Sequence, residues 1–323
     1  MILREFVHNI PYCAAYMRHF AYLFTILRLN AKFFEYYFVI LLEILGSALY
    51  NGCNRIRIMK IAILTKPVLW DNPARAKLLA ALKSCGDFDI VEVPAGGDIP
   101  SDCERLLVFG GDGTMLDAAV KCARVGVPLV GVNLGNLGFL TGFESEADPE
   151  RVADALLNGD VRKRMLLGCK SAKGNFLALN DFVLKSADTR PVTVKLFVDG
   201  SFVDSYRSDG VIVATPTGST AYSLSAGGPV MAPELDAIVV NPVCPHTLHS
   251  RPLVVGGNSE IRLELSASEN AVLVTDGNKT ADLGGNSVVM ISKSPLLAPF
   301  IVTDGHNFYE KLLDKMNRWG TTP

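Results

Sequence analysis

The stretch that decides the fold is Arg105-Leu-Leu-Val-Phe109-Gly110-Gly111-Asp112-Gly113-Thr114. Its first five residues predict a buried strand, and the residues from Thr114 to Val125 predict a helix. Glycines at the end of a strand permit positive φ and let backbone N–H groups approach an anion closely. Because the following helix directs its first N–H groups at the same place, the loop is typical of phosphate binding.

The loop contains one carboxylate, Asp112. A carboxylate at this place is able to accept a hydroxyl proton or to orient a metal ion. The simpler alternative is a tight turn in which Asp112 only caps the helix at Thr114. The chain has no GxxxxGK[ST] P-loop, and Leu116 stands where a dinucleotide fingerprint needs its third glycine.

Around this loop, short apolar runs alternate with helical segments. A helix is predicted at Pro73–Lys83, with Ala76, Leu79 and Leu82 as its apolar positions. The pattern predicts an α/β domain over residues 59–165, a parallel sheet with flanking helices. Its further strands are expected at Ile61–Leu64, Ile90–Val93 and Leu129–Val132.

After a boundary expected near Leu166 the pattern changes to alternating strands with Gly and Asn turns. Asp199-Gly200-Ser201 is a turn signal between two of them. Residues 166–323 are therefore predicted to form a β-rich, antiparallel domain, and one arrangement packs the C-terminal segment back on the first domain. The expected strands are Val192–Val198, Ser201–Tyr206, Val211–Ala214, Ile261–Leu265, Ala271–Thr275 and Val288–Ser292.

The composition excludes some classes of protein. The net charge of −2 does not favour a general nucleic-acid binder. The basic cluster Arg162-Lys163-Arg164 predicts a solvated turn. Seven scattered cysteines without a CxxC indicate a reducing cytosol, not a disulfide framework. The residues Cys244, His246 and His249 lack the further ligands of a closed zinc site, so we expect no metal centre there and a hydrogen-bonded cleft residue at His246.

Residues 1–58 differ from the rest. They hold six Lys and Arg against three Glu, a balance of +3, and no Asp. The apolar run Tyr36–Leu42 is shorter than the roughly 20 residues that a membrane-spanning helix needs. Three explanations are open: translation that starts at Met59, an interfacial amphipathic helix, or a helical hairpin that packs on the body or on another subunit.

Three further motifs suggest a ligand site. The glycines of Asn133–Leu140 indicate close approach of a ligand or of the neighbouring domain. Asn180-Asp181 suits ribose hydroxyls and base edges, although a plain Asx turn is the simpler explanation. The run Thr215–Ser225 carries seven hydroxyl side chains. Bracketed by a buried strand and Pro229, it predicts a close-fitting nucleotide site with Tyr222 as a stacking or edge-bonding group.

The chain resembles the NAD kinase family over roughly residues 59–310. The motifs that occur in the order seen in that family are Gly110–Thr114, Asn133–Leu140, Asn180-Asp181, Ser208–Pro229 and Asn241–Pro252. The Gly110–Thr114 element is shared with diacylglycerol and sphingosine kinases, whereas the run Thr215–Pro229 is far more specific to NAD kinases. Two departures are visible: Asn180-Asp181 replaces the family's usual Asn-Glu, and Asp276-Gly277-Asn278 replaces its Asp-Gly-Gln.

The resemblance implies a cytoplasmic homo-oligomer, a dimer or tetramer, that binds NAD between its two domains. It implies transfer of the ATP γ-phosphate to the 2′-hydroxyl of the adenosine ribose of NAD, with Mg²⁺ or Mn²⁺ as the metal bound with ATP. Asp112 would be the general base and Gly113 would lie against the phosphates. The residues expected to bind NAD are Asn180, Asp181, Asp209, Thr220, Ala221, Tyr222 and Ser225.

Two alternatives belong to other classes. A lipid kinase of the diacylglycerol type would explain the apolar N-terminus, and the hydroxyl-rich run around Tyr222 argues against it. A non-catalytic dinucleotide sensor would use the same fold without turnover. No nucleic acid and no firm membrane partner are expected.

Overall fold

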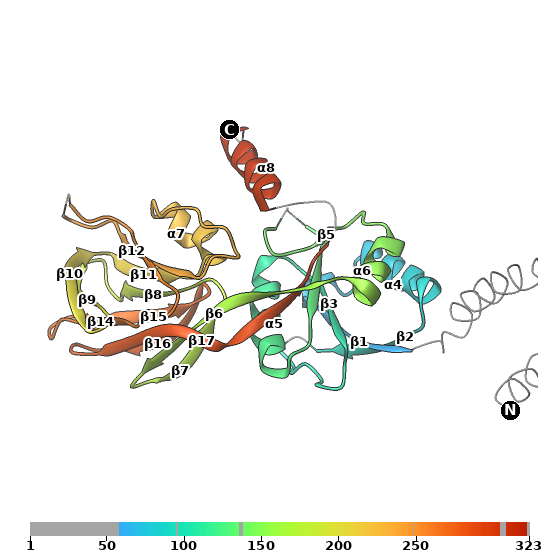
Figure 1. Ribbon diagram of the computed structural model, residues 1–323, viewed down its shortest axis with the longest axis horizontal. Coiled ribbons are helices and arrows are strands. Elements are labelled where there is room, and N and C mark those ends of the chain that lie inside the picture. Colours follow the sequence, from blue (N-terminus) through green and yellow to red (C-terminus); the bar gives the residue numbers. More distant parts are fainter. Residues whose placement is uncertain (1–57, 95, 136–137, 248, 304–307, 322–323) are drawn as a thin grey trace, which may run out of the picture. The chain divides into compact units, whose positions relative to one another are not determined.

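A computed structural model describes residues 58–94, 96–135, 138–247, 249–303 and 308–321 (Figure 1). The expectations about an N-terminal extension fall on residues 1–57, outside these ranges, as do Asn136 and Leu137 of the second glycine-rich loop. Within the same ranges, no helix is long and apolar enough to cross a membrane.

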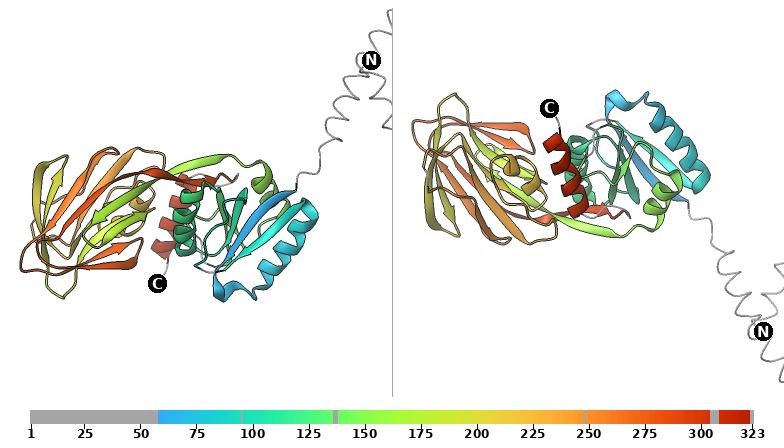
Figure 2. Two further views of the ribbon diagram at one scale, coloured as in Figure 1. Left: turned by 90° about the horizontal axis from the view of Figure 1, so that it is seen from below. Right: turned by 90° about the horizontal axis from the view of Figure 1, so that it is seen from above.

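The first region is a parallel sheet covered by helices on both faces, as the sequence predicts. Its strand order is β4-β3-β1-β2, and all three pairings are parallel. Helix α5 packs on one face and helices α4 and α6 pack on the other (Figure 2). The elements are β1 (Met59–Thr65), η1 (Pro67–Leu69), α4 (Pro73–Cys85), β2 (Phe88–Val93), β3 (Arg105–Phe109), α5 (Asp112–Val125), β4 (Leu129–Asn133), β5 (Phe143–Glu144) and α6 (Pro149–Asn158).

The buried face of α4 differs from the expected one. Ala76 is exposed, while Leu82 is buried as predicted and Arg75 is buried beside it. The Nε atom of Arg75 donates a hydrogen bond to Thr65 Oγ1 at 2.9 Å, and its guanidinium pairs with Glu92 at 2.6 Å. A charged side chain replaces the predicted alanine because its donors are satisfied inside the fold.

The second region consists of antiparallel strands in two facing layers, which confirms the predicted β-rich character. One layer continues the first sheet in the order β10-β9-β14-β17-β4, and the other has the order β13-β12-β11-β8-β15-β16. The elements are β6 (Val161–Ser171), β7 (Gly174–Ala178), β8 (Asp181–Ser186), β9 (Val192–Val198), β10 (Ser201–Ser208), β11 (Gly210–Ala214), η2 (Gly218–Thr220), α7 (Tyr222–Ser225), β12 (Ala237–Val243), β13 (Leu253–Gly256), β14 (Ile261–Leu265), β15 (Ala271–Thr275), β16 (Asn278–Leu283), β17 (Val288–Ile301) and α8 (Phe308–Thr321).

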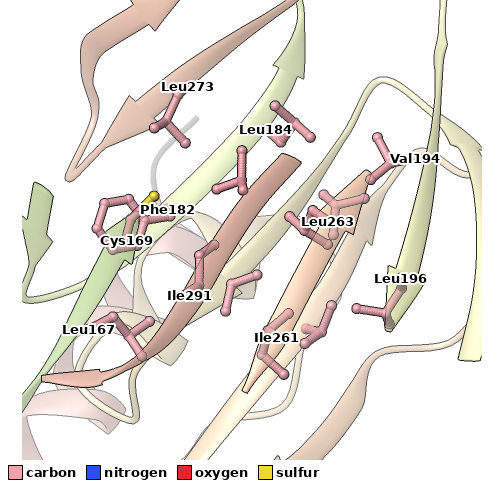
Figure 3. Packing of buried hydrophobic residues seen from close by; sticks show 14 of the residues in the cluster. Leu167, Cys169, Phe182, Leu184, Val194, Leu196, Ile261, Leu263, Leu273 and Ile291 are labelled. Atoms are coloured by element: carbon pink, nitrogen blue, oxygen red, sulfur yellow. The ribbon is translucent and has the colours of Figure 1, made fainter. Parts of the chain in front are cut away.

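The core of this region lies between the two layers. Alternate residues of each strand point into it, as the period of 2 requires. Figure 3 shows Leu167 and Cys169 of β6 with Phe182 and Leu184 of β8 in this cluster. The opposite face of β8 carries Asp181, Val183 and Lys185 toward a pocket. One strand therefore supplies both the core and the candidate site.

The long strands β6 and β17 connect the two regions (Figure 1). Strand β17 pairs antiparallel with β6 along its length, and its Phe300 pairs in parallel with Leu129 of β4. Leu166, near which the domain boundary is expected, lies inside β6, and the boundary stays a prediction. The prediction of a turn at Arg162–Arg164 is wrong, because these residues are part of β6 and pair with β17, whereas the predicted exposure to solvent is found for Arg162 and Lys163.

Candidate active site

Asp112 is the first residue of α5, two residues before the expected helix start, and Gly111 is the N-cap. Its carboxylate accepts hydrogen bonds from the backbone N–H groups of Phe139 at 2.9 Å and Leu140 at 3.0 Å. A Cβ atom on Gly138 would lie 2.4 Å from Asp112 Oδ1, so glycine is required there. Asp112 thus joins the two glycine-rich loops, Gly110–Thr114 and Asn133–Leu140.

The glycines around Asp112 have different surroundings. A Cβ atom on Gly110 would meet the Thr114 side chain at 2.5 Å, so this glycine serves packing. Cβ atoms on Gly111 or Gly113 would meet nothing within 4 Å. Gly113 is exposed in the first turn of α5, where helix N–H groups favour an anion.

The Asn180-Asp181 pair is held by Asp276, which no motif in the sequence marked as a site residue. Its carboxylate accepts hydrogen bonds from the backbone N–H groups of Leu179 at 2.9 Å, Asn180 at 2.7 Å and Asp181 at 3.1 Å. Asp276 and Gly277 have φ angles of 47° and 81°, the left-handed conformation of a tight hairpin turn. The Asp-Gly dipeptide between two alternating strands signalled this turn, but not its contact with residues almost one hundred positions away.

Asp181 and Asp276 are neighbouring buried acids. Burial, and secondly the charge of Asp276, raises the pKa of Asp181 from 3.8 to about 7. Burial also raises the pKa of Asp276, against the three backbone N–H groups, which lower it. Asp181 therefore exchanges a proton near neutral pH, and a ribose hydroxyl beside it would meet either an acceptor or a donor.

The hydroxyl-rich run Thr215–Ser225 is hydrogen-bonded to, and closely packed against, the backbone at Asn180. Thr215 Oγ1 donates to the carbonyl of Leu179 at 2.6 Å, and Thr215 N–H donates to the carbonyl of Asn180 at 2.9 Å. A Cβ atom on Gly218 would lie 2.0 Å from the Asn180 oxygen, so only glycine permits this approach. The two motifs therefore form one structural unit.

We call the hollow beside this unit the Tyr222 pocket. It has a volume of about 400 Å³ and also receives Leu116 of α5. Four residues predicted to bind NAD line it: Asn180, Asp181, Ala221 and Tyr222. The Tyr222 side chain is 40% exposed, which leaves an aromatic surface for stacking.

The other residues predicted to bind NAD, Asp209, Thr220 and Ser225, are not among the residues that line this pocket. Asp209 is exposed, and it is among the smaller causes of the raised pKa of Tyr222, of which burial is the largest. Ser225 is exposed at the end of α7. Thr220 is buried and lines a second hollow, which also receives Arg164. His246 is exposed, and its backbone N–H donates to the carbonyl of Arg207.

The place of Asp112 in the fold defines a class of protein. Asp112 lies at the carboxyl edge of a parallel sheet, beside Gly111 and Gly113, which leave space for a ligand. This arrangement suits a nucleotide-dependent phosphotransferase without a P-loop. Two family profiles narrow this class. The ATP-NAD kinase N-terminal domain matches residues 89–161, and the ATP-NAD kinase C-terminal domain matches residues 179–303. The chain therefore belongs to the NAD kinase family.

Individual relatives agree with this assignment. The NAD kinase of Caldanaerobacter subterraneus is 42% identical over 229 residues, which cover 68% of this chain and 80% of that protein. The NAD kinase of Azotobacter vinelandii is 44% identical over 229 residues, covering 68% and 77%. The resemblance seen in the motifs is confirmed.

Solved structures show the same fold. An NAD kinase from Archaeoglobus fulgidus in complex with ATP has a TM-score of 0.69 and 27% identity, covering 82% of this chain and 100% of that chain. Yeast NADH kinase complexed with NADH has a TM-score of 0.69 and 24% identity, covering 82% and 89%.

Proposed function

We propose that this kinase transfers the γ-phosphate of ATP to the 2′-hydroxyl of the adenosine ribose of NAD, giving NADP. Membership in the NAD kinase family supports the reaction. The relative from Archaeoglobus fulgidus, solved in complex with ATP, supports ATP as the donor.

The observation that carries the acceptor site is the Tyr222 pocket, which gathers residues from three separate motifs. In this proposal the adenine stacks on Tyr222 beside Ala221, and the ribose hydroxyls bond to Asn180 and Asp181. The neighbouring Asp209, Thr220 and Ser225 extend the contact with NAD.

Asp112 is the proposed base. It accepts the proton of the 2′-hydroxyl, and the ribose oxygen forms a bond to the γ-phosphorus. The bond between the γ-phosphorus and the β–γ bridging oxygen breaks, and ADP leaves. Each Asp112 oxygen accepts a hydrogen bond from a backbone N–H, which fixes the orientation of the carboxylate. Gly113 lets the phosphates approach the first turn of α5.

A divalent cation, Mg²⁺ or Mn²⁺, accompanies ATP in this proposal and neutralises phosphate charge. Across the described ranges, no group of three or more His, Cys, Asp or Glu side chains is placed to hold a metal ion. Phosphate oxygens and water would therefore supply most ligands, as Mg²⁺ commonly requires. Asp112 is the loop carboxylate that would share in holding it.

We further propose a cytoplasmic homo-oligomer, a dimer or tetramer. Family membership supports this assembly. Light scattering of the purified chain during size-exclusion chromatography would measure its mass, and a monomer at assay concentration would contradict the proposal.

The reaction is tested by a coupled NADP-formation assay with Mg-ATP on the full chain and on a chain that starts at Met59. We expect both to turn over. Asp112→Asn should lower kcat by about 10² to 10⁴ while NAD affinity by calorimetry stays near that of the wild type.

Other outcomes point elsewhere. An unchanged rate in Asp112→Asn would remove Asp112 as the base. NAD binding without turnover by the wild type would indicate the dinucleotide sensor, and phosphorylation of diacylglycerol in place of NAD would indicate the lipid kinase.

A further inference from the structure

Arg164 is the half-buried member of the basic cluster on β6, where Arg162 and Lys163 are exposed. Its guanidinium carbon lies 4.8 Å from the centre of the Phe300 ring. Within the part of the chain that the structure describes, no group accepts a hydrogen bond from this guanidinium or pairs with it within 4 Å. A guanidinium has five N–H donors in a fixed fork, so this arrangement leaves them directed at a ligand or water.

The space beside Arg164 is a cavity of about 260 Å³, which we call the Arg164 cavity. Phe139 and Leu140 line it, and their N–H groups hold the Asp112 carboxylate. Thr217 and Thr220 add hydroxyl side chains to its wall. The cavity is smaller than the roughly 300 to 1,000 Å³ of pockets that enclose a whole ligand, so it suits one polar end of a substrate.

The charges around the cavity are mainly positive. Arg162, Lys163 and Lys311 line it with Arg164, against one lining carboxylate, Glu234. Glu234 lies 3.6 Å from Arg162 and is partly neutralised there. Burial lowers the pKa of Arg164, whereas the carboxylates of Glu234 and Asp112 act to raise it. An arginine remains charged under these conditions, so the cavity favours an anion beside Asp112.

We propose that Arg164 is a further catalytic residue, which binds the phosphate chain of ATP and neutralises the charge of the γ-phosphoryl group during transfer. The inference rests on the proposed function and names the donor side of the same site. The guanidinium of an arginine forms two parallel hydrogen bonds to phosphate oxygens. Positioning and charge neutralisation supply most of the catalysis in phosphoryl transfer.

The pyrophosphate of NAD has the same chemistry, and the arrangement of the two hollows favours ATP. Thr220 lines the Arg164 cavity and the next residue, Ala221, lines the Tyr222 pocket. With the adenosine of NAD in the Tyr222 pocket, its 2′-hydroxyl would lie near Asp112. The γ-phosphate of ATP must approach this hydroxyl, so the anion that reaches Arg164 from there is the phosphoryl group being transferred.

The test compares Arg164→Met, Arg164→Lys and a control, Arg124→Met, in the full chain. Arg124 is exposed in the last turn of α5, the helix end opposite Asp112. Steady-state NADP formation is measured against ATP and against NAD separately. We expect Arg164→Met to lower kcat/KM for ATP by about 10² to 10³ and to leave the NAD affinity by calorimetry within about twofold. Arg164→Lys should regain about tenfold, and Arg124→Met should match the wild type.

Two results would overturn the assignment. One is a wild-type kcat/KM for ATP in Arg164→Met. The other is a loss of NAD affinity as large as the loss for ATP, which would place Arg164 on the acceptor or make it structural. A wild-type chain that forms no NADP would sink the proposed function instead, and ATP affinities of the three variants by calorimetry would still decide whether Arg164 binds the donor.

Discussion

Gly113 and Gly218 belong to the two glycine-bearing loops of the candidate site, and they serve opposite purposes. In the loop Gly110–Thr114, a side chain on Gly113 would meet open space. In the run Thr215–Ser225, a side chain on Gly218 would collide with the backbone of Asn180. Gly113 leaves the surface beside it open for a ligand, whereas Gly218 is packed against the backbone of Asn180. Glycine in a loop therefore indicates close approach, without saying whether a substrate or the protein itself approaches.

The hydroxyl groups of the run Thr215–Ser225 also contact the protein itself. Ser219 Oγ donates to the carbonyl of Pro216 at 2.7 Å and accepts from Met231 N–H at 2.9 Å. Thr220 Oγ1 donates to the carbonyl of Thr217 at 3.2 Å. These side chains hold the conformation of the loop, and that conformation presents the next residues to the pocket. These hydroxyls therefore stabilise the shape of the loop, and the binding of a nucleotide by this run stays a proposal.

The largest effect is expected when the stability and NAD binding of Gly218→Ala are compared with those of Gly113→Ala. The first adds a methyl group 2.0 Å from the Asn180 oxygen, and the second adds one in open space. We expect Gly218→Ala to lower the free energy of unfolding by about 1 to 3 kcal/mol and to abolish NAD binding. Gly113→Ala should leave stability unchanged or raise it by up to about 1 kcal/mol, since alanine favours a helix. Urea unfolding and calorimetry with NAD measure both, and equal stabilities would contradict the packing argument.

A smaller effect is expected at the anchor of Asn180-Asp181. Asp276→Asn keeps the size of the side chain but replaces one acceptor oxygen with an NH₂ group, so a backbone N–H loses its partner. We expect KM for NAD to rise about tenfold while kcat at saturating NAD changes less than about threefold. Asp282→Asn, whose side chain is 73% exposed on β16, is the control. An unchanged KM for NAD in Asp276→Asn would show that the anchor does not position the acceptor.

The last expected effect depends on pH and concerns Asp181. The folded state holds the pKa of Asp181 at about 7, above its ordinary 3.8. The folded state therefore binds more protons than the unfolded state between these values, and stability is lost as pH rises from 3.8 to about 7. Asp181→Asn removes this dependence, so its stability relative to the wild type should be greater at about pH 8 than at about pH 5, by a few kcal/mol at most. Urea unfolding at both pH values measures this, and an equal difference would show that Asp181 ionises normally.

Much of the fold follows from local pattern. The strands at Arg105–Phe109, Val192–Val198 and Ile261–Leu265 are found with the predicted bounds, because apolar periodicity and turn residues act over a few positions. The family also follows from local motifs, since Gly110–Thr114 and Thr215–Pro229 are continuous segments of the sequence.

What only the tertiary structure decided is which distant residues meet. The sequence places Asp276 in a turn, and the fold brings its carboxylate to the N–H groups of Asn180 and Asp181. The charges of Arg162–Arg164 suggested solvent, and pairing with β17 put Arg164 beside Phe300, in a cavity that Phe139 and Leu140 also line. The reason is physical: polarity and periodicity are properties of neighbours along the chain, whereas burial, pKa and ligand contact depend on strands paired across it.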